Sequence, residues 1–250
     1  MNYVKSYLII TMLVGVQIGY SQCDANGDGD LNIQDVVIEV NCILTPGCWD
    51  GEPVCEDIDG NVYETIQIGE QLWMAENLKV THYNNGEEIP NITNNGVWGY
   101  LSTGAYGDYD NNPTNSETYG RLYNWFAVDD DRGVCPDGWH LPSDNEYTVL
   151  TDYLGGESVA GGKMKEAGLE YWNSPNAGAT NESGFTGLPA GYRFYNNGTY
   201  GNMGDLGYFW SSSESSSNYA WFRLLHYNSS LVYRYSNNRR DGISVRCLED

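Results

Sequence analysis

The stretch Val134-Cys-Pro-Asp-Gly-Trp-His-Leu-Pro-Ser143 leads directly into the clearest helix signal of this 250-residue chain. Ser143 and Glu146 have the spacing of a capping box, in which each side chain accepts a hydrogen bond from the backbone N–H of the other residue. The positions that follow carry apolar side chains at helical spacing and then a glycine pair: Tyr147, Leu150, Leu154 and Gly155-Gly156. We therefore predict a helix that begins after Ser143 and stops at the glycine pair.

Short strands are predicted on both sides of this helix. Residues 61–68 alternate between apolar and polar side chains, and Gly69-Glu70 is placed to turn the chain back through residues 71–75. Asn197-Gly198 predicts a second hairpin, which starts at residues 192–195. Further strands are expected at residues 220–226, 231–235 and 243–247.

A second short helix is expected at residues 120–127. Two short helices among many strands predict a domain of the α+β class. In the expected strand at 231–235, one face carries Tyr233 and Tyr235 and the other carries Arg234. One of these two faces is therefore expected to meet solvent or a ligand.

The formal net charge of −22 is unevenly distributed along the chain. Residues 24–59 contain ten acidic residues and no Lys or Arg, whereas residues 193–246 contain six Arg and three acidic residues. A protein this acidic repels nucleic acid and anionic membranes, so no nucleic-acid partner is expected. In the C-terminal part the arginines are interleaved with Tyr and Asn, a composition that suits planar or sugar-like ligands.

The first 21 residues are typical of a secretory signal peptide. Lys5 gives the positive start, residues 8–16 form a short apolar core, and Gly19-Tyr20-Ser21 places small residues at the two positions that favour cleavage before Gln22. The apolar run is too short to cross a membrane, and no other segment is long enough. We therefore expect an extracellular or cell-surface protein without a membrane span.

The stretch Asp24-Ala-Asn-Gly-Asp-Gly-Asp-Leu-Asn-Ile-Gln-Asp35 has the spacing of a twelve-residue calcium loop. Oxygen-bearing side chains occupy alternating ligand positions, Gly29 stands at the sharp turn, and the seventh position donates its backbone carbonyl. The alternative, an acidic glycine-rich surface turn, leaves the filling of every ligand position unexplained. We predict one Ca²⁺ bound by Asp24, Asn26, Asp28, Asp30 through its carbonyl, Asn32 and Asp35.

A short helix is expected after the loop, so that residues 22–45 resemble one half of a dockerin, the cohesin-binding module of extracellular assemblies. Asp in place of Glu at the last ligand position, as at Asp35, is typical of dockerins, and the resemblance implies a cohesin-like partner. Residues 46–56 are rich in Pro and Gly, which predicts a linker. The cysteines of this region allow three disulfide pairings, which the sequence leaves open: Cys23, Cys42, Cys48 and Cys55.

Seven phrases farther along the chain recur, in the same order, in a family of secreted bacterial proteins. They include Phe185-Thr-Gly-Leu-Pro-Ala-Gly191 and lie at residues 59–63, 68–78, 120–125, 134–143, 185–191, 208–214 and 242–247. On these phrases, residues 57–250 resemble the Fibrobacter succinogenes major paralogous domain family. The resemblance implies a C-type lectin-like fold, whose two ends are brought together, and a disulfide between Cys135 and Cys247. Such a bridge closes a long loop and stabilises the fold by about 4–5 kcal/mol in the loop-entropy account.

No catalytic motif emerges from the sequence. His82, His140 and His226 lie outside any H-E-x-x-H pattern, and neither G-x-S-x-G nor a phosphate-binding loop occurs. The sugar-calcium tripeptides of lectins are absent as well. We therefore expect a protein that is not an enzyme, although a carboxylate pair for glycoside hydrolysis is a geometric feature that sequence leaves open.

The C-terminal turns carry the side chains that we expect to bind a ligand. Tyr, Ser, Asn and Arg combine rigid aromatic area with adaptable hydrogen bonding, and they are concentrated in residues 215–219, 227–230 and 236–240. The candidate ligand-binding residues are Tyr219, Tyr227, Tyr233, Arg234, Tyr235 and Arg239. The expected function is that of a secreted or surface non-catalytic protein that binds a polysaccharide or another protein. The alternatives are a component of a polysaccharide-degrading assembly, docked through the dockerin-like module, and a glycan-active enzyme.

Overall fold

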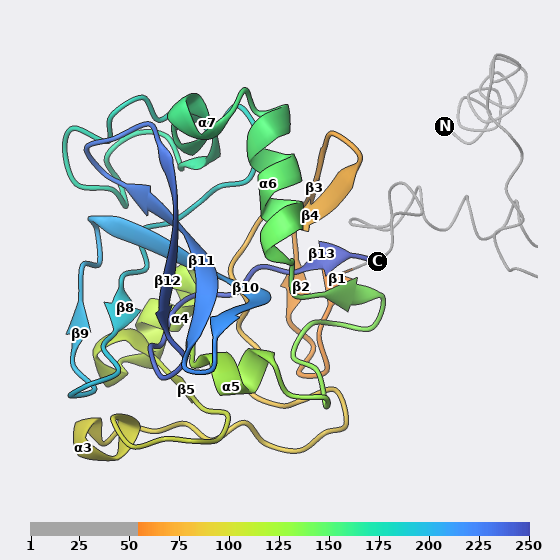
Figure 1. Cartoon of the computed structure of the whole chain (residues 1–250), viewed down its shortest axis with the longest axis vertical. Coiled ribbons are helices and arrows are strands. Elements are labelled where there is room, and N and C mark those ends of the chain that lie inside the picture. The colour runs from red at the N-terminus through yellow and green to blue at the C-terminus, as the bar shows by residue number, and fades with distance from the viewer. Residues whose placement is uncertain (1–54) are drawn as a thin grey trace, which may run out of the picture. The chain divides into compact units, whose positions relative to one another are not determined.

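Two sheets organise the part of the chain that the structure, a computed structural model, describes, namely residues 55–250 (Figure 1). A three-stranded antiparallel sheet contains, in chain order, β10 (Leu206–Ser216), β11 (Tyr219–His226) and β12 (Val232–Asn238). A four-stranded sheet has the order β3 (Thr65–Ile68), β4 (Gln71–Met74), β13 (Leu248–Glu249) and β7 (Trp139–His140). Because β13 pairs with β4, the first and last parts of the described chain lie side by side.

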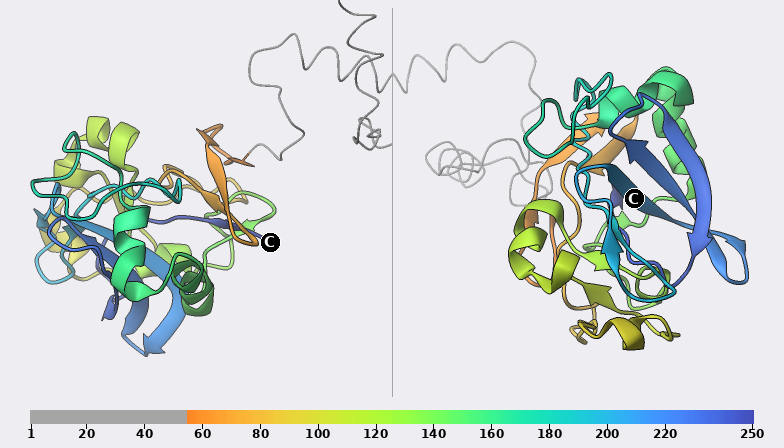
Figure 2. Two further views of the ribbon diagram at one scale, coloured as in Figure 1. Left: turned by 90° about the horizontal axis from the view of Figure 1, so that it is seen from above. Right: turned by 90° about the vertical axis from the view of Figure 1, so that its left-hand side faces the viewer.

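Short elements connect and flank these sheets (Figure 2). Three two-stranded ladders are β1 (Cys55–Glu56) with β2 (Val62–Tyr63), β5 (Tyr106–Gly107) with β6 (Leu122–Tyr123), and β8 (Tyr192–Arg193) with β9 (Tyr200–Gly201). The helices are α3 (Asn95–Trp98), the 3₁₀ helix η1 (Tyr109–Asn111), α4 (Pro113–Tyr119), α5 (Trp125–Val128), α6 (Asp144–Tyr153) and α7 (Glu157–Met164). The described domain is thus a mixture of short helices and small antiparallel sheets, as the sequence predicts.

The capping box at the start of α6 is confirmed. Ser143 Oγ accepts a hydrogen bond from the Glu146 backbone N–H at 3.2 Å, and the Glu146 carboxylate accepts one from the Ser143 N–H at 2.6 Å. At the other end Gly155 and Gly156 have φ of +102° and +92°, values that favour glycine and turn the chain away from the helix. The local sequence therefore determines both ends of α6.

The predicted hairpins and C-terminal strands are confirmed in part. Strands β3 and β4 form the hairpin around Gly69, β8 and β9 form the hairpin around Gly198, and β11 and β12 cover the two expected strands. The predicted helix at residues 120–127 is wrong over its first half. There Leu122 and Tyr123 form β6, and helix α5 starts only after Asn124, whose side chain accepts a hydrogen bond from the Ala127 N–H.

The predicted strand at residues 243–247 is also wrong as a regular strand. Ile243 bridges Tyr123 on one side and Ser244 bridges Phe209 on the other, while Val245 is fully buried. The segment thus passes between two ladders and joins neither, because its backbone groups bond alternately to different neighbours. The domain also has more than the two predicted helices. Helices α3, α4 and α7 were not predicted because they are too short or too polar to show apolar periodicity.

The apolar core has two parts. One lies between the three-stranded sheet and helices α6 and α7, where Phe209 and Leu225 face Tyr147 and Met164. The other surrounds Trp125 on the opposite side of the sheet and is closed by the predicted disulfide. Cys135 and Cys247 form that bridge, 112 residues apart in sequence. The disulfide that the family resemblance implies is therefore confirmed.

The N-terminal predictions lie outside the described residues. They are the signal peptide, the calcium loop, the dockerin-like helix and the pairing among Cys23, Cys42, Cys48 and Cys55, of which the first three lie outside those residues. All of these stay predictions. Cys55 is buried within β1. Over residues 55–250, none of the helices has the length and apolar character needed to cross a membrane.

Candidate ligand-binding cleft

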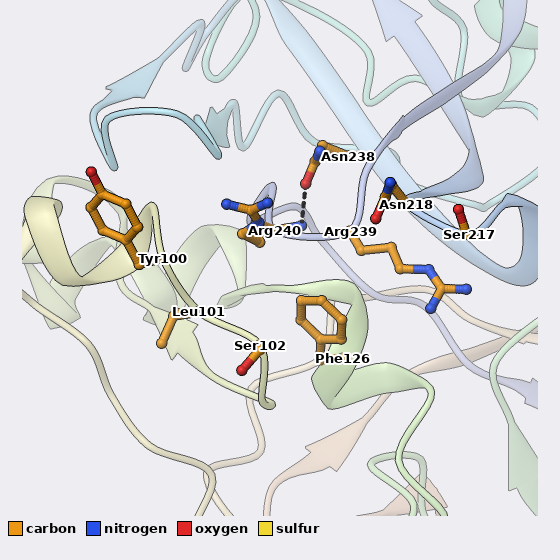
Figure 3. Close-up of a pocket in the computed structure, with 9 residues that line it drawn as sticks. All are labelled: Tyr100, Leu101, Ser102, Phe126, Ser217, Asn218, Asn238, Arg239 and Arg240. Atoms are coloured by element: carbon orange, nitrogen blue, oxygen red, sulfur yellow. Dashed lines mark hydrogen bonds between the residues drawn. The ribbon is translucent and has the colours of Figure 1, made fainter.

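A cleft of about 290 Å³ opens at one end of the three-stranded sheet (Figure 3). Three segments far apart in sequence form it: the turn between β10 and β11, the residues at and after the end of β12, and the loop after α3. Phe126 of α5 contributes from below. The lining residues are Tyr100, Leu101, Ser102, Phe126, Ser217, Asn218, Asn238, Arg239 and Arg240. We call this site the Arg239–Arg240 cleft.

Backbone hydrogen bonds hold the two arginines in place. The Arg239 N–H donates to the Asn218 carbonyl at 3.0 Å, and the Arg239 carbonyl accepts from the Trp125 N–H at 2.8 Å. The Arg240 N–H donates to Asn238 Oδ1 at 3.1 Å, and the Arg240 carbonyl accepts from Trp98 Nε1 at 2.7 Å. The wall of the cleft is therefore tied to α3, α5 and the β10–β11 turn at once.

The two guanidinium groups have different surroundings. Arg239 lies over the Trp125 ring at 4.3 Å, pairs with Glu214, and has a side chain only 15% exposed. Burial raises the pKa of nearby Asp129, against the opposing charge of Arg239. Arg240 donates through Nη1 to the Gly99 carbonyl at 2.7 Å and forms no salt bridge with any residue from 55 to 250. In Figure 3 the Arg240 guanidinium points toward the Tyr100 side of the cleft, and that of Arg239 points away from it.

Aromatic and amide side chains complete the lining. Tyr100 is 88% exposed and stands at one rim, while Phe126 is partly exposed. Asn218 and Ser217 are exposed at the opposite rim. Apolar faces and hydrogen-bonding groups thus meet around a cationic wall, the combination expected in a ligand site.

Two of the three predicted turns meet at this cleft. Residues 215–219 and 236–240 lie together because Tyr219 pairs with Asn238 across β11 and β12. Tyr219 is 41% exposed beside the cleft, and Arg239 lies within it. The third turn, at residues 227–230, follows the opposite end of β11.

The remaining predicted residues lie elsewhere on the sheet. Tyr233 and Tyr235 stack on one face of the edge strand β12, with ring centroids 5.8 Å apart, and Tyr235 is 51% exposed. Arg234 points to the other face, where it pairs with Asp144 and lies over the Trp221 ring at 3.6 Å. Tyr227 stacks on the His226 ring at the far end of β11. The alternation predicted for this strand is confirmed, but the six residues do not form one site.

Sequence reasoning missed Tyr100, Ser102 and Phe126, which reach the cleft from the first half of the domain. No local pattern distinguishes them from other loop residues, so only the tertiary structure could reveal them. Arg240 lies within the predicted turn at residues 236–240, but it was not among the six residues predicted individually to bind the ligand.

Two of the three histidines contact carboxylates, and the third, His226, stacks on Tyr227. His140 contacts Glu146 at 3.1 Å and Asp250 at 2.8 Å, and His82 contacts Asp59 at 2.5 Å. His140 thereby ties the C-terminal residue to the capping box of α6. Residues 55–250 hold no group of three His, Cys, Asp or Glu side chains spaced to bind a metal ion.

Comparison with protein families matches residues 66–249 to the Fibrobacter succinogenes major domain. The chain belongs to the Fibrobacter succinogenes major domain family. The match begins in β3 and ends in β13, so it contains the cleft, both sheets and the disulfide. Comparisons with curated proteins and with solved structures find no match.

Proposed function

We propose that this protein is a non-catalytic binding protein, exported to the cell surface or the medium, whose Arg239–Arg240 cleft holds a polysaccharide. The observation that carries the proposal is the convergence of Tyr100, Phe126, two asparagines and two arginines on one cleft. Flat aromatic faces pack against sugar rings, and amide, hydroxyl and guanidinium groups bond to hydroxyls. At about 290 Å³ the cleft lies at the small end of ligand sites, which suits a short stretch of a longer chain held in an open groove.

The fold that we propose for the domain is C-type lectin-like. The pairing of β13 with β4, which joins the two ends of the domain, and the Cys135–Cys247 disulfide support this assignment. The proposed binding mode differs from that of lectins in which calcium bridges the sugar. Here side chains alone make the contacts.

For the N-terminal residues, the proposal includes two roles, export from the cell and calcium binding. Residues 1–21 direct secretion, and the loop from Asp24 to Asp35 binds one Ca²⁺ at the millimolar concentrations found outside cells. We expect an affinity in the range of extracellular modules, about 10⁻⁴–10⁻³ M. Calorimetric titration of the mature chain tests this. Binding heat that is lost in an Asp28→Ala, Asp35→Ala double variant is expected, and no heat at millimolar calcium would contradict the assignment.

The second candidate function is a subunit of an extracellular polysaccharide-degrading assembly. Only the half-dockerin sequence favours it, through the cohesin-like partner that a dockerin implies. A partner from the secreted fraction that binds in calcium and is released by a chelator would support docking.

A panel of immobilised polysaccharides tests the main proposal. Wild-type protein is expected to bind at least one of them without releasing shorter sugars, and Tyr100→Ala is expected to weaken that binding. The matched control is Tyr153→Ala, which removes a 65% exposed tyrosine from the end of α6, far from α3 and α5 in Figure 1. A panel with no binding contradicts the proposal, and release of shorter sugars contradicts its non-catalytic part.

A further inference from the structure

Arg240 differs from every other Lys or Arg that the structure describes. Most of these cations form an ion pair: Lys79, Arg121, Arg132, Lys163, Arg223, Arg234 and Arg239. Three others are fully buried and donate to backbone carbonyls: Lys165, Arg193 and Arg246. Among residues 55–250, Arg240 alone is reachable by solvent and lacks a carboxylate partner.

Hydrogen bonds to neighbouring residues fix the position of the unpaired Arg240 guanidinium. One donor, Nη1, bonds to the Gly99 carbonyl, and the Arg240 backbone is fixed by Asn238 and Trp98. A guanidinium has five N–H donors, so the group keeps donors free for a ligand in the cleft. Glu214 pairs with Arg239, and the cation that influences the pKa of Asp129 is likewise Arg239, so neither carboxyl is a partner of Arg240.

A carboxylate is the ligand group that fits this position. Arginine presents parallel N–H donors that match the two oxygens of a carboxylate, and such charge-assisted bonds are stronger than neutral ones. In a chain with a net charge of −22, however, a densely charged polyanion is repelled at long range. The ligand is therefore one whose carboxylates are isolated along an otherwise neutral chain.

We infer that the Arg239–Arg240 cleft recognises a uronic acid residue of a mainly neutral polysaccharide, with Arg240 pairing to the sugar carboxylate. This inference rests on the proposed polysaccharide binding and names its ligand class. Tyr100 and Phe126 face the sugar rings, and Asn218 and Ser217 lie within reach of their hydroxyls from the opposite rim.

The experiment uses the mature protein and sparsely charged oligosaccharides that carry glucuronate, galacturonate or mannuronate residues. Each oligosaccharide is supplied in its acid form and in a carboxyl-reduced form, which has the same rings and linkages but no charge. The variants are Arg240→Gln, the conservative Arg240→Lys, and the control Lys163→Gln, which removes an equal charge from a surface pair with Glu182. Circular dichroism confirms that each variant is folded.

Wild-type protein is expected to bind at least one acid form roughly 10–100 times more tightly than its reduced form, the range of one charge-assisted hydrogen-bond pair. Arg240→Gln abolishes that preference, Arg240→Lys restores part of it, and Lys163→Gln leaves it intact. Equal binding of the acid and reduced forms overturns the inference while the proposed function stands. If none of the oligosaccharides binds in either form, the inference is wrong. The proposed function is wrong only if the panel of immobilised polysaccharides shows no binding either.

Discussion

At the scale of single residues, Asp241 is unusual because its carboxyl group is buried, which makes its ionisation unfavourable. Its side chain is fully buried one residue beyond the cleft, and Oδ1 accepts a hydrogen bond from the Tyr195 N–H at 2.7 Å. Oδ2 has no hydrogen-bond partner in the part of the chain that the structure describes. Within residues 55–250 it forms no salt bridge, and burial raises the pKa of its carboxyl to about 7. The folded state therefore holds this proton more tightly than the unfolded chain does.

This residue predicts a pH-dependent stability. The contribution of Asp241 is complete below the unfolded pKa near 3.8 and is lost as the pH rises to about 7, a loss on the order of 2–4 kcal/mol. Asp241→Asn keeps an acceptor at Oδ1 but cannot ionise, so its free energy of unfolding should fall less between pH 4 and pH 7.5. Urea unfolding of both proteins at the two pH values measures the difference. Parallel pH profiles would show that Asp241 does not titrate in this range.

At the scale of elements, the capping box makes α6 the most sequence-determined helix. Ser143→Ala removes the acceptor for the Glu146 N–H, and we expect a loss of about 1 kcal/mol in the free energy of unfolding. The control is Ser158→Ala, at an exposed position in α7, where a change within about 0.5 kcal/mol is expected. Denaturant unfolding compares the two. If both variants lose the same stability, the cap does not define the helix start.

The elements predicted correctly share a local cause. Helix α6 and the hairpins at Gly69 and Gly198 are specified by residues within a few positions of one another. The segment 243–247 was mispredicted because its apolar alternation reflects burial between two ladders and not membership of one sheet. Periodicity reports which side chains are buried, and the hydrogen-bond partners of the backbone depend on distant segments.

At the scale of the whole molecule, the candidate site depends on long-range contacts. Sequence identified the turns at 215–219 and 236–240 but not the loop after α3, which lies more than a hundred residues earlier in the chain. The same limit explains why Arg234 was chosen as a ligand residue: its salt bridge with Asp144 joins β12 to α6 and cannot be read from either element alone. The amino-acid composition therefore identified the residues on one wall of the cleft, whereas the residues on the opposite wall are known only from the folded structure.

The most direct test of the central claim is to map where a bound polysaccharide fragment contacts the protein. Amide chemical shifts of the labelled mature chain are recorded while the best-binding oligosaccharide is titrated in. Binding at the Arg239–Arg240 cleft predicts that the largest changes cluster at residues 100–102, 217–218 and 238–240, with little change along α6. Changes that cluster instead on Tyr233 and Tyr235, with the cleft unaffected, would contradict the account and move the site to the open face of β12.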